Sequence, residues 1–463
     1  MSTATTQKPS APLPVQHAAA SRLHVVRPDE TSSPVPAVVG AGLRVPTLRG
    51  EVDYANFDHA ASTPALISVK AAVDTALTTY SSVHRGNGYA SQVTSAWYEQ
   101  AREEVAAFIG ARSDDTVIFT RNSTDSFNLL ARSLPRDTQV FVFESEHHAT
   151  LLPWNASQVV TLPVPSSVEH ALADLEEALL HATARHRLIA VAGASNVTGE
   201  IWPIDRIVRL ARQYRARVAL DAAQLAPHRA IDIAAQGIDY VAFSGHKLYA
   251  PFGAGVLAGR SDWLDAATPY LKGGGATTKV TTSGAQWATG PDRHEAGSPN
   301  VIGAIAIAAA CATISRSRDA LEAHEAALAA RLRDGLAAIP GVDTWSIFGD
   351  DHDRVAVFPF TIERLDSSLV STVLSTEHGI GVRDGKFCAH ILVDELLEDP
   401  WGEVPATAVR ASVGLANTVE HVDRLVAAVA ELAEHGPQRA YTRTETGWVA
   451  GDDTRDLSLP RPW

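Results

Sequence analysis

The sequence predicts an α/β fold with a mostly parallel sheet, followed by a smaller C-terminal α/β domain. Short apolar runs that end in polar residues have the form of strands buried on both faces. Segments with helical periodicity lie between these runs, for example over residues 168–183 and 204–212. Alternation of buried strands with helices is typical of βαβ units and a parallel sheet. The expected strands cover residues 116–119, 139–143, 187–192, 217–220 and 240–243.

The order of these patterns also predicts how the chain is divided. The N-terminal region is rich in Ala, Pro, Ser and Thr, a composition that does not support a packed core. A helix is expected over residues 319–339, where Pro340 and Gly341 end it. The predicted divisions are a flexible extension over residues 1–45, a large domain over 46–315 whose first segment contributes to the small domain, a small α/β domain over 316–436 and a tail over 437–463.

Composition restricts the class of protein and its compartment. The 463 residues carry a net charge of -14, which argues against nucleic acid or an anionic membrane as the main partner. No stretch reaches the roughly 18 apolar residues of a membrane span, and the N-terminus lacks the apolar core of a secretory signal. The two cysteines, Cys311 and Cys388, form no disulfide framework. A soluble cytoplasmic enzyme is therefore expected.

Polar residues stand where several of the apolar runs stop. His147, Asn196, Asp221 and Lys247 each lie just beyond a predicted strand. In an open α/β sheet, ligands bind at the carboxyl ends of the strands, so these four residues are expected to face one site. Lys247 follows a buried strand and stands beside His246, the setting of a lysine that forms Schiff bases. The alternative is a surface lysine that extends from a strand end into solvent.

This set of residues fits pyridoxal phosphate, which needs a lysine for its aldehyde and a carboxylate for its ring nitrogen. Asp221 suits the ring nitrogen, and His147 suits the face of the ring. Serine and threonine at a helix N-terminus suit the phosphate. The expected cofactor contacts are completed by Asn196 and Gln224 at the phenolic oxygen, and by Ser123, Thr124, Ser244 and His246 at the phosphate.

Each of these residues has a simpler explanation when it is taken alone. Asp221 and the Ser123-Thr124 pair can be helix caps, and residues 196–199 can be a turn. His147 or His148 can be a buried histidine without a catalytic role. No spacing of cysteine and histidine indicates a metal site. The joint pattern is what favours the cofactor.

Several motifs resemble the class V aminotransferase family, and most closely its branch of Suf-type cysteine desulfurases and selenocysteine lyases. They are Glu146-His-His-Ala149, Ser195-Asn-Val-Thr-Gly199, Asp221-Ala-Ala-Gln224, Ser244-Gly-His-Lys-Leu-Tyr249 and Glu295-Ala-Gly-Ser-Pro-Asn300. The resemblance implies a homodimer of the pyridoxal-phosphate-dependent fold type I, with Lys247 as the Schiff-base lysine. It also implies that Ser298 reaches the partner subunit's phosphate and that Arg410 binds the substrate carboxylate.

The resemblance places the nucleophilic cysteine of this branch at Cys388. Arg383 matches the arginine that precedes that cysteine, and we assign it with Arg410 to substrate binding. The match departs at Lys386-Phe387, where the family has a histidine pair, and at Ile391, where it has a proline.

An extended segment over residues 385–390 would place Lys386, Cys388 and His390 on one side. Their charges would then favour the Cys388 thiolate. The alternative is that Cys388 is a small buried apolar residue.

The expected function is therefore a pyridoxal-phosphate-dependent enzyme acting on an amino acid. The main interpretation is a desulfurase or selenocysteine-lyase-like enzyme that releases alanine and forms a persulfide on Cys388, with a sulfur-acceptor protein as a further partner. The alternative is a class V aminotransferase or β-eliminating lyase in which Cys388 is structural. A third interpretation is a cofactor-binding regulatory protein without turnover.

Overall fold

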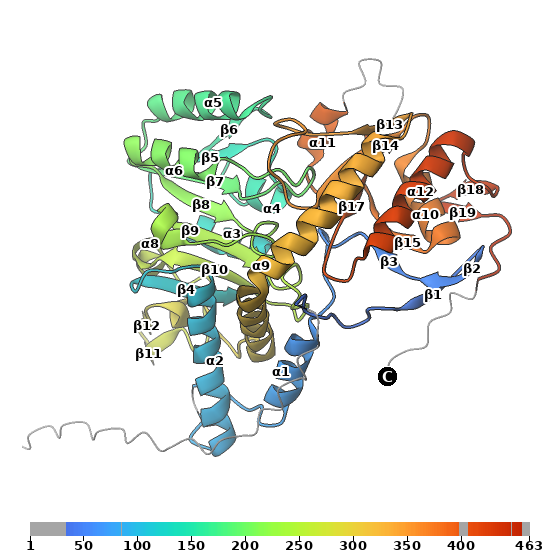
Figure 1. Ribbon diagram of the computed structural model, residues 1–463. Helices are drawn as coiled ribbons and strands as arrows, with labels where there is room; N and C mark the ends of the chain where they lie inside the picture. The colour runs from blue at the N-terminus through green and yellow to red at the C-terminus, as the bar shows by residue number, and fades with distance from the viewer. Residues whose placement is uncertain (1–33, 85, 398–405, 446, 456–463) are drawn as a thin grey trace, which may run out of the picture.

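The computed structural model describes residues 34–84, 86–397, 406–445 and 447–455. Its largest layer is a seven-stranded sheet with the order β4-β10-β9-β8-β7-β5-β6 (Figure 1). Strands β5 to β9 are parallel, whereas β10 pairs antiparallel with both β9 and β4. The predicted strands are confirmed as parts of β4 (Asp115–Thr120), β5 (Thr138–Phe143), β7 (His186–Ala192), β8 (Arg217–Asp221) and β9 (Tyr240–Ser244), joined by β6 (Val159–Leu162) and β10 (Gly255–Arg260).

Both faces of this sheet are buried, which explains why its strands read as continuous apolar runs. Alternate side chains of β5 enter different cores: Val140 and Val142 on one face, Phe141 and Phe143 on the other. Helices α3 (Ser123–Ser133) and α8 (Ser261–Ala266) contribute to the first core. The second core includes α1 (Ile67–Leu77), α2 (Tyr89–Phe108), α5 (Val168–Leu180) and α6 (Ile204–Gln213).

A single long helix, α9 (Val301–Ala337), connects the large sheet to the small domain (Figure 1). The helix predicted over residues 319–339 is the second half of α9, so the expected start at Asp319 is wrong. Its first half packs in the large core through Ile307 and Ile314, and its second half packs in the small one through Leu328 and Leu332. By length and composition α9 could cross a membrane, but 56% of its most apolar window is buried inside the protein.

The small domain is an α/β layer on the far half of α9. Its sheet has the order β13-β14-β17-β16. The N-terminal strand β3 (Ala55–Asn56) joins this domain by pairing in parallel with β15 (Ile380–Gly381). The other elements are β13 (Val342–Thr344), β14 (Val357–Ile362), α10 (Ser367–His378), β16 (Arg383–Gly385), α11 (His390–Leu396), β17 (Ala408–Ser412) and α12 (Val419–His435).

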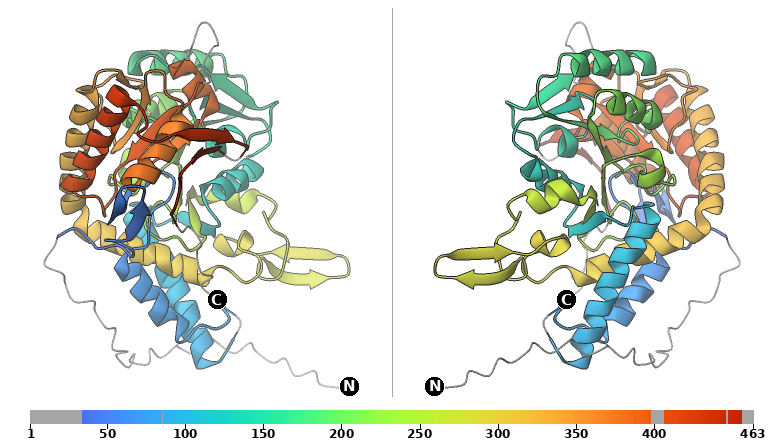
Figure 2. Two further views of the ribbon diagram at one scale, coloured as in Figure 1. Left: turned by 90° about the vertical axis from the view of Figure 1, so that its right-hand side faces the viewer. Right: turned by 90° about the vertical axis from the view of Figure 1, so that its left-hand side faces the viewer.

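The hairpin of β11 (Thr277–Thr281) and β12 (Gly284–Trp287) projects from the large domain, well clear of the rest of the chain (Figure 2). Its side chains are mostly exposed. A short turn of 3-10 helix, Pro291–Arg293, follows it and leads to the segment that carries Ser298.

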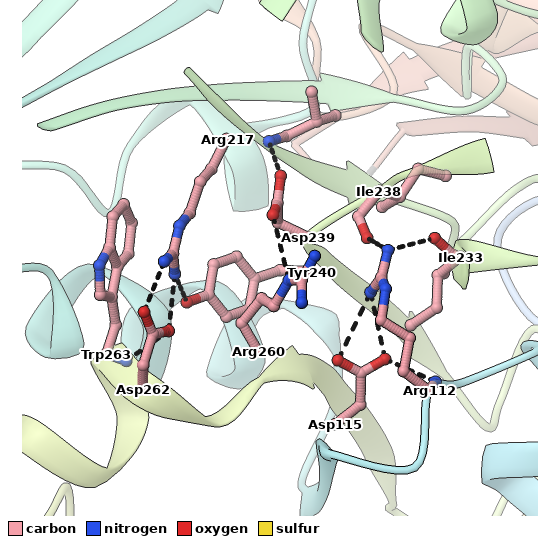
Figure 3. A network of polar contacts seen from close by, with 11 residues as sticks. Arg112, Asp115, Arg217, Ile233, Ile238, Asp239, Tyr240, Arg260, Asp262 and Trp263 are labelled. Carbon is pink, nitrogen blue, oxygen red and sulfur yellow. Dashed lines mark hydrogen bonds and ion pairs between the residues drawn. The ribbon is translucent and has the colours of Figure 1, made fainter. Parts of the chain in front are cut away.

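Charged side chains gather at the edge of the large sheet where β8 and β9 begin (Figure 3). Arg217 at the start of β8 donates to Asp262 and to the Tyr240 hydroxyl. Arg112 donates to the backbone oxygens of Ile233 and Ile238 at 2.7 and 2.8 Å. These charged groups therefore occupy the edge of the sheet opposite the one that carries Asp221 and Lys247.

The two ends of the described chain meet on the small domain. The predicted extension over residues 1–45 lies mostly outside the described residues, and Val38 in its last part bridges to Leu66 before α1. An antiparallel two-stranded hairpin lies at each end of the described chain, and both hairpins contact the buried Glu377 of α10. They consist of β1 (Arg44–Thr47) with β2 (Gly50–Asp53), and of β18 (Tyr441–Thr444) with β19 (Gly447–Ala450).

Glu377 is the carboxylate that joins these hairpins to the small domain. Its side chain is 1% exposed, and its two oxygens accept from Arg49 Nη2 (3.0 Å) and the Tyr441 hydroxyl (3.1 Å). We expect Arg49→Ala to destabilise the protein by about 3 kcal/mol, because it leaves a buried carboxylate without its cation. Urea denaturation of the purified variant measures the change.

Asp423→Ala is the matched control, because it removes an exposed pair with Arg331 and leaves no buried charge. Its denaturation curve should stay close to that of the wild type. An Arg49→Ala curve that overlays the control would show that the Glu377 contacts contribute nothing to stability.

Candidate active site

Lys247 lies three residues beyond the end of β9, on the turn that leads toward β10. Its side chain is partly buried, and no hydrogen bond or ion pair holds its Nζ among the described residues. Burial lowers the pKa of this amine to about 8, against the opposing charge of Asp221. Lys247 therefore holds more neutral amine at pH 7 than an ordinary lysine does.

Asp221 ends β8, the strand next to β9, and is buried. Its Oδ2 accepts from the Thr150 hydroxyl at 2.7 Å, and its Oδ1 accepts from the Ala223 amide at 2.9 Å. These two bonds fix the plane of the carboxylate. Thr150 lies on the short helix that His147 caps, so its bond to Asp221 joins the carboxylate to that helix. The charge of Asp221 opposes the lowering of the pKa of both Lys247 and His147.

His147 caps the short helix α4 (His148–Leu151), and its Nδ1 accepts from the Ala149 amide at 3.0 Å. Burial, followed by the charge of Lys247, lowers the pKa of this imidazole to about 4. The ring is therefore neutral at pH 7, with its proton on Nε2. A flat, neutral ring that is held at one edge suits contact with the face of an aromatic cofactor.

Asn196 and Gln224 are both buried and both use their amide nitrogens on backbone oxygens. Asn196 Nδ2 donates to Phe387 O at 2.7 Å, and Gln224 Nε2 donates to Ala60 O at 2.7 Å. Each side-chain amide retains a second N–H. Contact of either residue with a phenolic oxygen stays a prediction.

The expected phosphate site lies at the first turn of α3. Ser123 N donates to Ser244 Oγ at 2.8 Å, and the two hydroxyls are 3.1 Å apart. A Cβ on Gly255 would stand 2.5 Å from the Asn122 backbone, so glycine at this place lets β10 approach the helix start. Thr124 is exposed and His246 is partly buried. The helix N-terminus and two hydroxyls form a suitable anion site.

Ser298 does not join this group within the single chain. It is exposed and lines a cavity of about 910 Å³, together with Tyr80, His84, Gly275 and Glu295. None of the strand-end residues lines that cavity. The expected role of Ser298 at a partner's phosphate stays a prediction.

Arg410 is buried on β17 and faces the strand ends from the small domain. Its Nη1 donates to Asn196 O at 2.8 Å, and its Nη2 lies 3.3 Å from Asp58 Oδ1. Burial lowers the pKa of its guanidinium to about 10, against the attraction of Asp58. The other predicted arginine, Arg383, is exposed, 3.8 Å from Asp58 Oδ2. Asp58 thus orients both arginines, a role that the sequence did not reveal.

Cys388 is exposed and Cys311 is buried. The expectation of an extended segment over residues 385–390 is wrong: residues 387–388 form a turn, and α11 begins at His390. Lys386 pairs with Asp394 on α11, so its charge is already partnered. The turn is bound to the strand ends, because the His148 amide donates to the Cys388 carbonyl at 2.9 Å, and the adjoining Phe387 ring lies 4.9 Å from the guanidinium carbon of Arg410.

The fold and site together define a class of protein. It is a two-domain α/β protein in which a desolvated lysine, a carboxylate and a neutral imidazole meet at the strand ends beside a helix N-terminus. This donor set fits pyridoxal phosphate, and the amine of Lys247 has no competing partner among the described residues.

Comparison with known proteins agrees with this class. Residues 55–425 match the family model Aminotransferase class-V. The chain is 37% identical over 359 residues to a probable cysteine desulfurase of Vibrio cholerae serotype O1, covering 75% of this chain and 85% of the relative. It is also 37% identical over 358 residues to a cysteine desulfurase of Dickeya dadantii, covering 75% and 84%.

Solved structures give the same result. The crystal structure of the cysteine desulfurase CsdA from Escherichia coli superposes with a TM-score of 0.71 at 34% identity, covering 82% of this chain and 95% of that one. The apo cysteine desulfurase of Thermococcus onnurineus NA1 gives 0.74 at 31%, with the same coverages. The chain belongs to the class V aminotransferase family. It has the fold type I of these enzymes and is pyridoxal phosphate dependent like them.

Glu146, beside His147, is a buried carboxyl that the sequence did not single out. It is 1% exposed, its Oε1 accepts from Ala192 N at 3.0 Å, and its Oε2 has no partner among the described residues. Burial raises its pKa to about 8. An unfolded chain has this pKa near 4.5, so the folded state binds more protons between these values, and stability falls as pH rises from 4.5 to 8.

Glu146→Gln should remove this pH dependence, because glutamine cannot ionise. We expect the unfolding free energy of the variant, relative to the wild type, to rise by a few kcal/mol from pH 5 to pH 8, at roughly 1.4 kcal/mol for each unit. Urea denaturation at pH 5, 6.5 and 8 measures it. The exposed Glu177→Gln serves as control, and parallel pH profiles for wild type and Glu146→Gln would contradict the assignment.

Proposed function

We propose that this chain is a cysteine desulfurase that transfers the sulfur of cysteine to Cys388 and releases alanine. The observation that carries the proposal is the position of Cys388, which is exposed to solvent on a turn that Asn196 and the His148 amide bind to the strand ends, next to Arg410. A nucleophile, a base and a carboxylate-binding group thus share one site. The relatives named above are cysteine desulfurases, which supports the same choice.

The cofactor would be held by residues from four strand ends and one helix. Lys247 would carry its aldehyde, Asp221 would contact the ring nitrogen and His147 would cover the ring. When bound, pyridoxal phosphate supplies an electron sink that makes the α-proton of an amino acid removable. The remaining proposed contacts are Asn196 and Gln224 at the phenolic oxygen, and Ser123, Thr124, Ser244 and His246 at the phosphate.

Arg410 would orient the substrate by binding its carboxylate, with Arg383 at the exposed side of the same place. The planar guanidinium suits two parallel bonds to a carboxylate, and burial strengthens them. Lys247, with its pKa near 8, is suited to take the proton from Cα and later to return a proton to Cβ.

The Cys388 thiolate would then attack the substrate sulfur. A sulfur–sulfur bond forms as the Cβ–S bond breaks, and the electron pair of that bond takes a proton on Cβ. Cysteine and a protein thiol thus give alanine and a protein persulfide, with no other oxidant or reductant. In the alternative, an aminotransferase or a β-eliminating lyase, Cys388 would be a buried residue with a structural role only. The exposure of Cys388 therefore favours the desulfurase.

We further propose a homodimer. Ser298 is exposed in the lining of the 910 Å³ cavity, which the Lys247 group does not line, so a second copy would give it a cofactor to contact. An apolar groove of about 390 Å³ between α1, α2 and α9 offers contact surface for that copy. A sulfur-acceptor protein that takes the persulfide from exposed Cys388, and a cytoplasmic location, complete the proposal.

The cofactor assignment predicts that the purified holoprotein is yellow and that borohydride fixes the cofactor to Lys247. The reason is that Lys247 is the amine with a lowered pKa and no partner at this site. Peptide mapping by mass spectrometry should find the added mass on the peptide that contains Lys247. Label on another lysine, or a protein that cannot take up pyridoxal phosphate, would contradict the assignment.

The desulfurase assignment predicts that Cys388→Ala loses sulfide and alanine release from cysteine to near background, while it still binds the cofactor. The matched control is Cys311→Ala, which removes the buried thiol and should keep the turnover rate of the folded enzyme. Both products are measured from cysteine with an added reductant. Full sulfide release by Cys388→Ala would favour the lyase, and conversion of the cofactor to its amine form would favour the aminotransferase.

A further inference from the structure

The turn that carries Cys388 is held in an unfavourable backbone conformation. Phe387 has a φ of 53° and Cys388 a φ of 56°, both in the left-handed region. Residues other than glycine and asparagine rarely adopt this backbone region, and two such residues in succession raise the conformational energy of the turn. Contacts from elsewhere in the protein must therefore hold the turn, as is typical of functional sites.

Two of these contacts come from the large domain. Asn196 Nδ2 donates to the Phe387 carbonyl at 2.7 Å, and the His148 amide donates to the Cys388 carbonyl at 2.9 Å. Asn196 follows β7, and His148 begins α4. Both consecutive carbonyls of the turn are therefore bound to the edge where the strands end.

The third contact joins the turn to Arg410. The Phe387 ring is 8% exposed, and the guanidinium carbon of Arg410 lies 4.9 Å from its centre. Arg410 is itself 3% exposed, and its Nε has no hydrogen-bond partner among the described residues. An aromatic face attracts a cation most strongly when both are desolvated. The ring thus compensates in part for the missing hydrogen bond.

We propose that Phe387 is a positioning residue that couples the substrate-carboxylate arginine to the nucleophile. Its ring orients Arg410, and its backbone, held by Asn196, sets the position of Cys388. The inference rests on the proposed function for the roles of these two residues. In cysteine the carboxylate and the sulfur are separated by only two carbons, Cα and Cβ, so one residue that touches both protein groups sets their spacing for this substrate.

Phe387→Leu tests the proposal, because leucine keeps an apolar side chain but has no aromatic face. In the holoenzyme we expect KM for cysteine to rise about tenfold and kcat to fall. The apparent Kd for alanine, read from the cofactor absorption, should weaken by a similar factor, because alanine needs Arg410 but not Cys388. The rate of Cys388 alkylation, read by mass spectrometry, should also change. Phe387→Tyr keeps the ring and should restore all four values.

Phe348→Leu is the matched control. Phe348 packs against the same apolar cluster as Phe387, and within the described part of the chain its ring contacts Trp202 and His352 rather than an arginine. It should lower the melting temperature and leave KM, kcat and the alanine Kd unchanged. The same behaviour in Phe387→Leu would overturn the proposal and make Phe387 a core residue only.

The two proposals fail in different ways. A wild-type enzyme that releases no sulfide from cysteine contradicts the desulfurase function. In that case, the alanine Kd and the rate of Cys388 alkylation still test whether Phe387 couples Arg410 to Cys388, because neither measurement needs turnover. Weaker alanine binding together with a changed alkylation rate in Phe387→Leu, both restored in Phe387→Tyr, supports the coupling. Wild-type values of both quantities in Phe387→Leu overturn it.

Discussion

Burial of a lysine amine beside a buried carboxylate is the constraint on which the rest of the site depends. Both faces of the large sheet are covered by apolar side chains, so the strand ends are where polar groups can gather in the interior. Asp221 ends β8, and Lys247 follows the neighbouring strand β9, so both lie at this edge of the sheet. Desolvation lowers the pKa of the amine to about 8, and the charge of the carboxylate opposes this shift. Both the protonated and the neutral amine are therefore populated near physiological pH.

The part of this site that lies on the parallel strands could be predicted from the sequence. A buried strand is a local pattern, and the direction of parallel strands determines where its last residues lie. Asn196, Asp221 and Lys247 were found for that reason. The contacts of Asn196 and Asp221 could not be found in the same way, because their partners Phe387 and Thr150 come from distant segments. Residue type alone does not distinguish Asp58, which orients Arg410, from a surface aspartate.

The long helix α9, which spans the boundary between the domains, shows a second limit of prediction from the sequence. The charged residues Arg316, Arg318 and Asp319 interrupt the apolar pattern of α9, which made one helix resemble two segments. The helix continues through them, because Leu321 beyond them still packs in the large core, and Leu328 further along packs in the small one. Periodicity reports which face of a helix is buried, and it cannot show that the buried environment changes along a continuous helix.

The departure from the family pattern before Cys388 has a structural counterpart. Lys386 stands where the resemblance leads us to expect a histidine. Its ammonium is bound by Asp394, so it is not directed at the thiol as an extended segment would have allowed. Phe387 replaces the other histidine, and its ring lies against Arg410. The guanidinium proposed for the substrate carboxylate and the turn that carries Cys388 are therefore joined through an aromatic ring, whereas the ammonium of Lys386 is directed to α11.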